Sequence, residues 1–271
     1  MFSEHTTDSG KAEKIVLKIG GSIITKKDVN EFPLEISEIK EKADDYIKYD
    51  VIRRIGKEIK EVLKEKNIQL ILVNGAGPFG HFLVKHDRPD NEVRWSVKYL
   101  NEKLVSEFRK TGLDTVSVVP SESCEFVNGE FNVSRLWKST NAIIKKDKIP
   151  STYGDVLNNG KIISGDDLVV LLAKQWRADK IIAATDVDGV FTKNPHIHKD
   201  AELIKALNID DNSIGYTKIK IDVTGEMASK VKKLKQAAID GIKCQIINGA
   251  KEGNIKAVLL GDESIGTLIL C

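Results

Sequence analysis

The sequence predicts an α/β fold in which helices cover both faces of a largely parallel sheet. Two observations indicate this fold. Strand-like and helix-like segments alternate along the 271 residues, as they do where crossover helices join parallel strands. The strand-like segments are also continuous apolar runs, which is the pattern of strands buried on both faces. With 41% hydrophobic and 30% charged residues, the chain is long enough for one large or two modest domains.

The first half of the chain begins with a short apolar strand and continues with a long amphipathic helix. In that helix Ile52, Ile55 and Ile59 recur at helical spacing, with charged residues on the opposite face. A later apolar run is closed by Pro120. We therefore expect strands at 15–17, 69–73 and 115–119, and helices at 52–63 and 92–111.

The second half of the chain continues the alternation. Two Asn-Gly pairs, Asn128-Gly129 and Asn159-Gly160, are typical of β-hairpin turns. Gly241 follows an amphipathic segment, and glycine is favoured just beyond a helix C-terminus. We expect helices at 165–177 and 225–239 and strands at 181–184, 244–247 and 267–270. Because the strand at 181–184 begins a second unit, we divide the chain into a flexible tail (1–13), an N-terminal lobe (14–177) and a C-terminal lobe (178–271).

Charge and cysteine content exclude several classes of partner. The net charge of +2 implies no general attraction to nucleic acid or to acidic membranes. Three cysteines without C-x-x-C spacing predict reduced thiols in a cytoplasmic setting. No apolar run reaches the roughly 18–20 residues that a membrane helix needs. The polar tail also lacks the apolar centre of a signal peptide, so we expect a cytoplasmic protein with no membrane partner.

The first strand runs directly into a loop with two adjacent glycines. The segment Lys18–Ser22 reads KIGGS, and Lys26 and Lys27 follow shortly after it. Ligands of α/β proteins bind at the carboxyl ends of the strands, where this loop is expected. Paired glycines allow the backbone to approach a ligand closely, and Lys18 supplies positive charge there. The alternative is a tight turn beside a solvated cluster of lysines.

A second glycine-rich loop, Gly75–Gly80, follows the strand at 69–73. Its G-x-G-x-x-G spacing matches the fingerprint of dinucleotide-binding folds, which requires an acidic residue at the tip of the next strand, about twenty residues later. Here the chain instead continues through Phe82–Pro89, which looks helical and then irregular. Such fingerprints usually follow the first strand of their unit, where this chain already has another glycine loop. We therefore favour a phosphate-binding loop over a nicotinamide-binding one. His81 follows the third glycine, where it can donate a hydrogen bond to a phosphate oxygen.

A polar segment that reads SGDD begins the helix expected at 165–177. Gly165 precedes Asp166 and Asp167 in this segment. Acidic residues in the first turn of a helix are ordinary partners of the helix dipole, which explains much of the pattern. An aspartate at the end of a glycine turn can also orient nearby lysines. Both interpretations of the two carboxylates stay open at this point.

Two more polar segments belong to the second unit. Asp186 and Asp188 lie in the stretch TDVDGV, whose spacing does not fit an EF-hand. A turn that contacts a ribose or a base is the better interpretation of that stretch. The segment Asp222–Met227 then leads into a helix that carries Lys230 in its second turn. A lysine near the start of a helix is well placed to hold a phosphate group.

These segments together resemble the amino acid kinase superfamily, and most closely its isopentenyl phosphate kinase branch. The resemblance extends from about Lys14 to the C-terminus, with KIGGS, GAGPFGH, SGDD, TDVDGV and DVTGEM in the family's order. It implies a three-layer α/β/α sandwich. It also implies that the N-terminal lobe, 14–177, binds a phosphate acceptor and that the C-terminal lobe, 178–271, binds ATP.

The resemblance implies a role for individual residues. In the catalytic group of Lys18, Lys27, Asp166 and His81, Lys27 stabilises the transition state, Asp166 organises the lysines and His81 binds the acceptor's phosphate. The implied ATP-binding residues are Lys18, Gly20, Gly21, Ser22, Gly77, Asp186 and Lys230. The implied acceptor-binding residues are Ala76, Gly77, His81 and Gly165. No residue is implied as a metal ligand.

Some positions depart from the family pattern or are ambiguous. Asn74 stands where relatives commonly have a histidine, Pro78 where a small residue is usual, and Glu226 where a second glycine is usual. The apolar part of an acceptor pocket is not evident from the sequence. Its candidates are side chains that could equally belong to the core, namely Phe82, Val84, Trp95 and Tyr99.

The resemblance implies an ATP-dependent kinase, with Mg²⁺, that acts on a small phosphorylated acceptor. Isopentenyl phosphate, converted to isopentenyl diphosphate, is the acceptor of the most similar branch, and the branch also implies a homodimer. A fosfomycin-type or other phosphonate kinase is an alternative, because the glycine–histidine loop would serve it too. A non-catalytic nucleotide-binding protein is a second alternative, but it would be expected to lose Lys18, Lys27 or Asp166.

Overall fold

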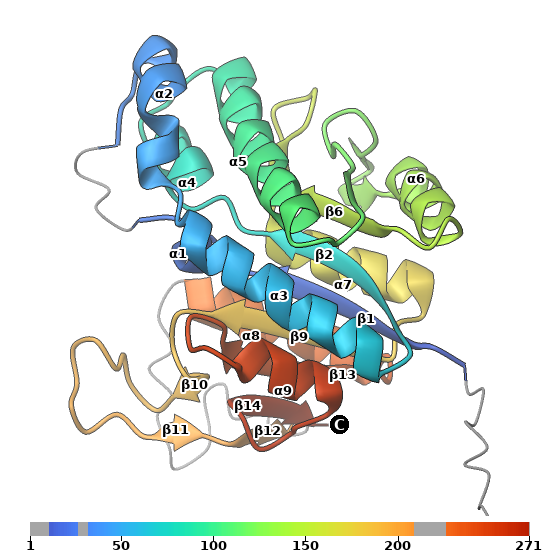
Figure 1. Ribbon diagram of the computed structural model, residues 1–271. Helices are drawn as coiled ribbons and strands as arrows, with labels where there is room; N and C mark the ends of the chain where they lie inside the picture. The colour runs from blue at the N-terminus through green and yellow to red at the C-terminus, as the bar shows by residue number, and fades with distance from the viewer. Residues whose placement is uncertain (1–10, 27–31, 209–225, 271) are drawn as a thin grey trace, which may run out of the picture.

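A single eight-stranded sheet forms the centre of the computed structural model, which describes residues 11–26, 32–208 and 226–270 (Figure 1). Neighbouring strands are parallel except for one antiparallel pair, β13 with β14. The strands lie in the order β12 (Ala206–Asn208), β14 (Thr267–Leu270), β13 (Lys243–Asn248), β9 (Lys180–Thr185), β1 (Glu13–Ile19), β2 (Ile68–Asn74), β6 (Ile149–Tyr153) and β3 (Thr115–Ser117). The largely parallel sheet predicted from the apolar runs is confirmed.

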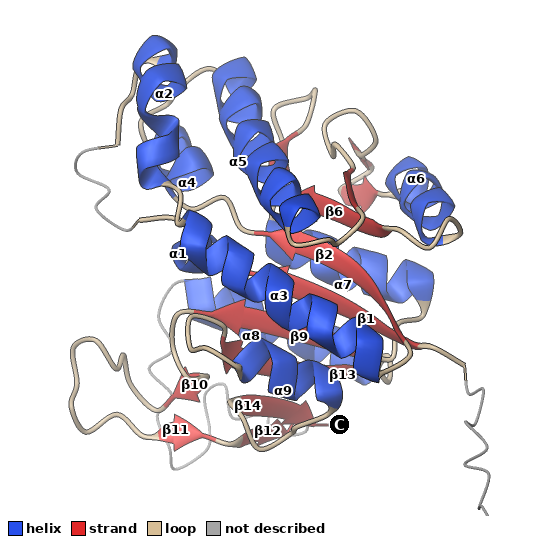
Figure 2. Ribbon diagram, in the orientation of Figure 1, coloured by secondary structure: helices blue, strands red, loops and turns tan. Residues whose placement is uncertain are grey.

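Helices cover both faces of this sheet (Figure 2). One face carries α1 (Gly21–Ile24), α3 (Tyr49–Glu65), α5 (Asp90–Lys110) and α9 (Asn254–Leu260), and the other carries α6 (Ser134–Ile144), α7 (Gly165–Trp176) and α8 (Glu226–Ile239). At one end of the first face lie α2 (Ile36–Lys42), the 3₁₀ turn η2 (Ala43–Tyr46) and α4 (Pro78–Lys85). The predicted three-layer α/β/α sandwich is confirmed.

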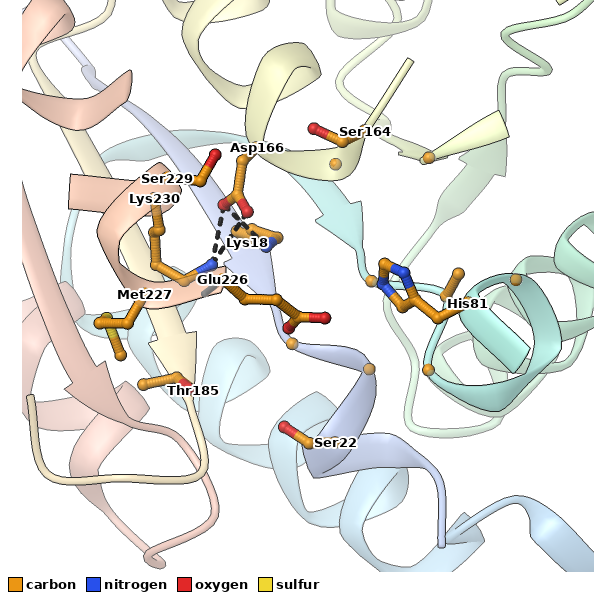
Figure 3. A pocket seen from close by; sticks show the side chains of 18 of the residues that line it. Lys18, Ser22, His81, Ser164, Asp166, Thr185, Glu226, Met227, Ser229 and Lys230 are labelled. Atoms are coloured by element: carbon orange, nitrogen blue, oxygen red, sulfur yellow. Dashed lines mark hydrogen bonds and ion pairs between the residues drawn. The ribbon is translucent and has the colours of Figure 1, made fainter. Parts of the chain in front are cut away.

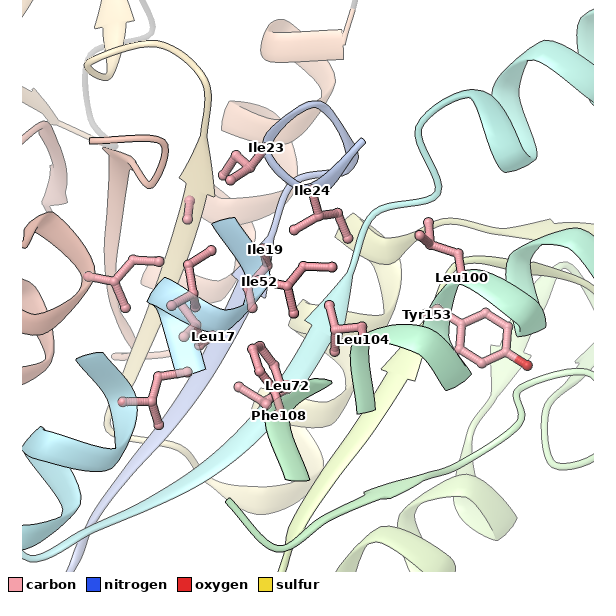
Figure 4. Packing of buried hydrophobic residues seen from close by; sticks show 14 of the residues in the cluster. Leu17, Ile19, Ile23, Ile24, Ile52, Leu72, Leu100, Leu104, Phe108 and Tyr153 are labelled. Atoms are coloured by element: carbon pink, nitrogen blue, oxygen red, sulfur yellow. The ribbon is translucent and has the colours of Figure 1, made fainter. Parts of the chain in front are cut away.

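The alternation of side chains along β1 divides the hydrophobic core into two halves. Ile15, Leu17 and Ile19 point into the core beneath α3 and α5, whereas Val16 points into the core beneath α7 and α8. Figure 4 shows the first core, in which Leu17 and Ile52 pack between the sheet and α3. Since both faces of β1 are fully buried, the strand reads as a continuous apolar run in the sequence.

The amphipathic helix expected at 52–63 is confirmed as part of α3. Its apolar stripe of Ile52, Ile55 and Ile59 is fully buried against the sheet. Burial of an isoleucine side chain contributes roughly 1.5–3 kcal/mol, so this stripe accounts for much of the attachment of α3 to the sheet.

Both predicted hairpins form. In the first, β4 (Glu125–Val127) pairs with β5 (Glu130–Asn132), and Asn128 and Gly129 have φ of 54° and 85°. Two successive positive φ values are the requirement of a type I′ turn. The second hairpin joins β7 (Asp155–Val156) to β8 (Ile162–Ile163). A third hairpin, β10 (Val190–Phe191) with β11 (Leu203–Ile204), was not expected.

The strands of the two predicted lobes meet in the middle of the sheet. Strands β1, β2, β3 and β6 come from 14–177 and the other four from 178–271, and parallel pairing of β1 with β9 joins the two sets. The division into an acceptor lobe and an ATP lobe stays a prediction. Residues 1–10 of the expected tail lie outside the described residues, and β1 begins at Glu13. Within the described ranges, no helix combines the length and the apolar character needed to cross a membrane.

Candidate active site

A cavity of about 750 Å³ lies at the carboxyl ends of β1, β2 and β9. This is the edge at which open α/β sheets bind their ligands. All five motif segments contribute to its wall. The described residues that the sequence predicted for the site all line it: Lys18, Gly20, Gly21, Ser22, Ala76, Gly77, His81, Gly165, Asp166, Asp186 and Lys230. Lys27 lies outside the described residues.

The two glycine loops touch each other at the floor of the cavity. A Cβ atom added to Gly21 would lie 2.2 Å from the backbone nitrogen of Gly77, and one added to Gly75 would lie 2.4 Å from the nitrogen of Gly21. Real side chains do not reach such distances, so both loops require glycine here. The sequence pattern predicted close approach to a ligand; the structure shows close approach of one loop to the other.

Backbone hydrogen bonds connect these loops to the strand ends. The Gly20 N–H donates to the carbonyl of Ala184 at the end of β9, at 2.9 Å, and the Gly75 N–H donates to the carbonyl of Ile19, at 2.8 Å. Gly77 has a φ of 53° and directly precedes α4, whose first residue is Pro78. Proline suits the first position of a helix because its missing N–H would have no partner in the helix, so this departure from the family pattern is compatible with the loop.

A carboxylate between two lysines lies on one side of the cavity (Figure 3). The Nζ of Lys18 is 2.7 Å from Oδ1 of Asp166, and the Nζ of Lys230 is 2.9 Å from the same oxygen and 3.0 Å from Oδ2. Both lysines are buried, with 8% of each exposed. They come from β1 and α8, and the aspartate comes from the first turn of α7. Asp166, on α7, therefore connects the end of β1 to α8 on the same face of the sheet.

The charges of this cluster change the pKa of its members. Burial, followed by the neighbouring Lys230 ammonium, lowers the pKa of Lys18 to about 8, although Asp166 acts in the opposite direction. Burial would raise the pKa of Asp166, but the charges and hydrogen bonds of the two lysines outweigh it and lower that pKa to about 2. With three charged groups, the cluster carries one excess positive charge. An anion that enters the cavity supplies the missing counter-charge.

Of the two adjacent aspartates, Asp166 and Asp167, it is Asp167 that caps the N-terminus of α7. The Asp167 N–H donates to Oγ of Ser164 at 3.1 Å, and the Ser164 N–H donates to Oδ2 of Asp167 at 3.1 Å, which is a capping box. Lys233 binds this cap, with its Nζ 2.7 Å from Oδ1 of Asp167. Lys233 also lines the cavity and was not predicted as a site residue. Its spacing of three residues from Lys230 was the available signal.

His81 faces the cavity from a different wall. It lies in the first half of α4, and Figure 3 shows its imidazole pointing into the space across from the cluster of Lys18, Asp166 and Lys230. Its exposed side chain has no hydrogen bond that would hold it in another role among the described contacts. The geometry therefore leaves the ring available to a ligand.

The apolar wall near His81 consists mostly of residues other than those predicted from the sequence. Of the four candidates, only Val84 lines the cavity. Phe82 packs on Phe32 with ring centroids 5.9 Å apart, and Trp95 stacks on Tyr99 at 5.1 Å, so these three aromatic candidates belong to the core or its margin. The wall is instead formed by aliphatic side chains that were not predicted, namely Val93, Val97, Val156, Ile162 and Ile163.

The loop after β9 forms the opposite wall. Asp186 lines the cavity, whereas Asp188 does not: it accepts hydrogen bonds from Asn248 and Lys251, both at 2.9 Å. Asp186 and Asp188 therefore do not belong to one binding site. Across the described ranges, no cluster of three or more His, Cys, Asp and Glu side chains could hold a metal ion. Glu226, the first described residue of α8, also lines the cavity and is exposed there (Figure 3).

Asn74, the remaining departure from the family pattern, lies outside the cavity in a buried polar network. It is 1% exposed, and its Oδ1 accepts a hydrogen bond of 2.7 Å from Asn101 on α5. Its Nδ2 donates to the carbonyl of Gly75 at 3.3 Å. Asn74 therefore connects the second glycine loop to α5 and does not line the cavity.

Two glycine loops in close contact beside a buried lysine pair give the carboxyl edge of the sheet the features of a phosphate-binding site. Residues 13–248 match the sequence model of the amino acid kinase family, and the chain belongs to that family. The superfamily resemblance of the five motif segments is thereby confirmed.

The chain is similar over almost its whole length to proteins named isopentenyl phosphate kinase. It is 31% identical to the enzyme of Methanothermobacter thermautotrophicus, covering 94% of this chain and 98% of that protein. It is 32% identical to that of Methanocaldococcus jannaschii, covering 91% and 95%. A solved structure of isopentenyl phosphate kinase superposes with a TM-score of 0.75 at 29% identity, covering 95% of this chain and 100% of the other.

Proposed function

We propose that this protein is an ATP-dependent kinase that converts isopentenyl phosphate to isopentenyl diphosphate. The observation that carries the proposal is the composition of the cavity. A buried cationic cluster and His81 face one space from two walls, and an aliphatic wall adjoins the histidine. An acceptor with a phosphate at one end and a short hydrocarbon at the other matches this arrangement. The names of the similar enzymes support the same acceptor.

The reaction requires positioning and positive charge more than it requires a base. A phosphate oxygen of the acceptor attacks the γ-phosphorus of ATP, and the bond from that phosphorus to the bridging oxygen breaks, so that ADP leaves with the electron pair. Charge accumulates on the oxygens of the transferring group in a loose transition state. The acceptor phosphate is already anionic near neutral pH, because its second pKa is about 6. The cavity must therefore overcome the repulsion between two anions.

We assign the roles within this reaction as the family resemblance implies. Lys18 and Lys230 neutralise the transferring phosphoryl group, and Asp166 holds the two ammonium groups in place. His81 and the N–H groups around Gly165 bind the acceptor phosphate. Ala76 also contacts the acceptor, and Gly77 is shared between the acceptor and the nucleotide's phosphates. The nucleotide's phosphates and sugar lie along the remaining predicted residues, namely Gly20, Gly21, Ser22 and Asp186. Lys27 keeps its proposed role in stabilising the transition state.

Mg²⁺ fits this cavity as a partner of the nucleotide. The ion prefers phosphate oxygens, with one or two carboxylates, to a dedicated protein cage. The cavity also offers the carboxylates of Asp186 and Glu226. We therefore propose that the nucleotide's phosphates hold Mg²⁺ and that the ion neutralises part of their charge. We also propose a cytoplasmic homodimer, in which the N-terminal lobe binds the acceptor and the C-terminal lobe binds ATP, with no nucleic-acid or membrane partner.

A coupled assay of ADP release tests the proposed function. The acceptors are isopentenyl phosphate, dimethylallyl phosphate, fosfomycin, acetylglutamate and UMP, each with Mg²⁺ and ATP. We expect turnover with the isoprenoid phosphates and little with the others. Turnover with acetylglutamate or UMP alone would contradict the proposal, and turnover with fosfomycin alone would establish the phosphonate-kinase alternative.

Replacement of His81 by alanine is expected to affect the acceptor and not the nucleotide. The KM for isopentenyl phosphate should rise about 10- to 100-fold, the range for one hydrogen bond to a charged group, while the KM for ATP changes little. His86→Ala is the matched control, because His86 lies just beyond the same helix and binds the carbonyl of Phe82 at 2.8 Å. If His81→Ala instead weakens ATP binding, the role assigned to His81 is wrong.

ATP affinity is expected to fall at alkaline pH because Lys18 must be charged to hold phosphate. Its pKa is lowered to about 8, so the ligand-free cluster loses this proton as the pH rises above that value. Well above the pKa, the affinity should fall toward about tenfold per pH unit. Titration calorimetry between about pH 7 and 9.5 measures this slope, and buffers of different ionisation enthalpy measure the proton taken up. Lys18→Met should bind more weakly but with a flatter pH profile; an unchanged profile would show that another group titrates.

A further inference from the structure

A partly buried ion pair on α3, outside the cavity wall, binds the segment between β13 and α9. Arg54 binds Glu58, one turn later on the same helix, with Nη1 2.7 Å from Oε1. Only 6% of Glu58 is exposed. The Glu58 carboxylate also accepts the backbone N–H groups of Gly253 and Lys256, each at 3.1 Å. Neither Arg54 nor Glu58 lines the cavity.

The guanidinium of Arg54 binds three consecutive carbonyl groups of that segment. Its Nη2 donates to the carbonyls of Gly249 and Ala250, at 2.9 and 3.1 Å, and its Nη1 donates to that of Lys251, at 3.1 Å. A planar guanidinium presents several donors in a fixed fork, whereas an ammonium would concentrate its charge at one point. The three carbonyl groups of 249–251 therefore share one side chain as their hydrogen-bond donor.

Residues 249–251 in turn contact the loop after β9. That loop lines the side of the cavity that we assign to the nucleotide. The Gly249 N–H donates to the carbonyl of Thr185 at 2.9 Å. A Cβ added to Gly249 would lie 2.7 Å from the Cβ of Ala184, so the two backbones are in close contact. Lys251 and Asn248 hold the carboxylate of Asp188, each at 2.9 Å. The neighbouring positions Ala184–Val187 and Gly189 line the cavity.

From these contacts we infer that Arg54 is a positioning residue for nucleotide binding. Arg54 fixes the carbonyls of 249–251, this segment fixes the loop at 184–189, and that loop shapes the nucleotide side of the cavity. The inference rests on the proposed function, in that it takes ATP as the ligand of this side. It predicts that replacement of Arg54 weakens nucleotide binding and leaves acceptor binding unchanged. The acceptor is assigned to the opposite side of the cavity, beside α4.

Arg53, the adjacent residue, provides a matched control for a purely structural effect. It also pairs with a buried carboxylate: its Nη1 lies 2.9 Å from Oε2 of Glu107 on α5, whose side chain is 5% exposed. Arg53→Met and Arg54→Met therefore each remove an arginine from α3 and leave a buried glutamate with fewer partners. They differ in direction, because Arg53 faces α5 and Arg54 faces the segment at 249–251.

The experiment measures ATP affinity directly, in the absence of acceptor, together with the KM of isopentenyl phosphate and the melting temperature of each variant. We expect both variants to melt at a lower temperature. Only Arg54→Met should raise the Kd of ATP, by about tenfold, with the acceptor KM within about threefold of the parent. Arg54→Lys should recover part of the melting temperature but little of the ATP affinity, because one ammonium cannot span three carbonyls.

Several outcomes would overturn the inference. Equal ATP affinity in Arg54→Met and Arg53→Met would show that Arg54 contributes to stability alone, as would an acceptor KM that rises as much as the Kd of ATP. Should Arg54→Met fail to fold, Gly249→Ala tests the same path at its contact with Ala184. The inference requires weaker ATP binding in Gly249→Ala as well. A parent protein that binds no ATP contradicts the proposed function itself, which separates the two failures.

Discussion

Replacement of Asp166 by asparagine is expected to lower kcat by about 10²- to 10³-fold, the size of effect seen when one preorganised electrostatic contact to a transition state is removed. Asparagine preserves the shape of the side chain but not its charge. The ammonium groups of Lys18 and Lys230 both lie within 3.0 Å of the carboxylate, and without it they repel each other in a buried site. One of them then moves away or loses its proton, and the transferring phosphoryl group loses a cation.

The matched control for this prediction is Asp167→Asn. Asp167 belongs to the capping box of the same helix, and an asparagine oxygen can still accept the Ser164 N–H. Its kcat should stay within about threefold of the parent, since a partly exposed ion pair such as that with Lys233 contributes little. Steady-state kinetics with saturating ATP and acceptor measure both variants. Equal losses in kcat would mean that the N-terminus of α7, and not the charge of Asp166, is what catalysis requires.

The distinction between these two aspartates illustrates what the sequence could predict about the site. Each motif is local, so its residues are identified before any fold is known, and the parallel sheet then brings the ends of its strands together. The roles of adjacent carboxylates are harder to separate, because successive residues of a helix point in different directions. The spacing from Ser164 to Asp167 is that of a capping box, and this spacing was the signal that separates Asp167 from Asp166.

The residues of the cavity's apolar wall could not be predicted from the sequence, for a physical reason. Val93 and Val97 lie on the buried stripe of α5, and such a stripe looks the same whether it faces the core or an empty cavity. Large aromatic side chains nearby, such as Trp95, were predicted as candidate ligand contacts. In the structure they pack on other side chains. Which part of a stripe meets a cavity is set by the neighbouring helices, and this information is spread over the whole chain.

Short elements were missed for a related reason. The helices α1 and α9 span four and seven residues, and neither is long enough to show a clear helical period. Their apolar residues, such as Ile24 and Val258, are buried by contact with longer elements that were predicted. The contacts of Arg54 belong to the same category, because they join α3 to a loop nearly two hundred residues later in the chain.

Replacement of Gly21 by alanine is expected to disable the enzyme while leaving most of its fold intact. Gly21 lies in α1 and is not among the glycines with positive φ, so alanine meets no backbone strain there. The obstacle is the second loop, because the new Cβ would lie 2.2 Å from the nitrogen of Gly77 and 2.7 Å from its Cα. Backbone atoms cannot turn aside as a flexible side chain can, so the two loops must move apart.

That separation displaces both phosphate-binding loops at once, and a shift of about 1 Å in a phosphoryl-transfer site can cost about 10²-fold in rate. We expect kcat/KM for ATP and for the acceptor to fall together, since each glycine loop contacts the shared phosphoryl group in the proposed reaction. Gly241→Ala is the control for stability: Gly241 has a φ of 81° and nothing within 4 Å of an added Cβ, so alanine strains the backbone far from the cavity. Kinetics and melting temperatures of the two variants should therefore diverge, with Gly241→Ala losing stability and Gly21→Ala losing activity. Full activity in Gly21→Ala would show that the two loops have room to separate without moving the phosphates, and that their close contact has no part in catalysis.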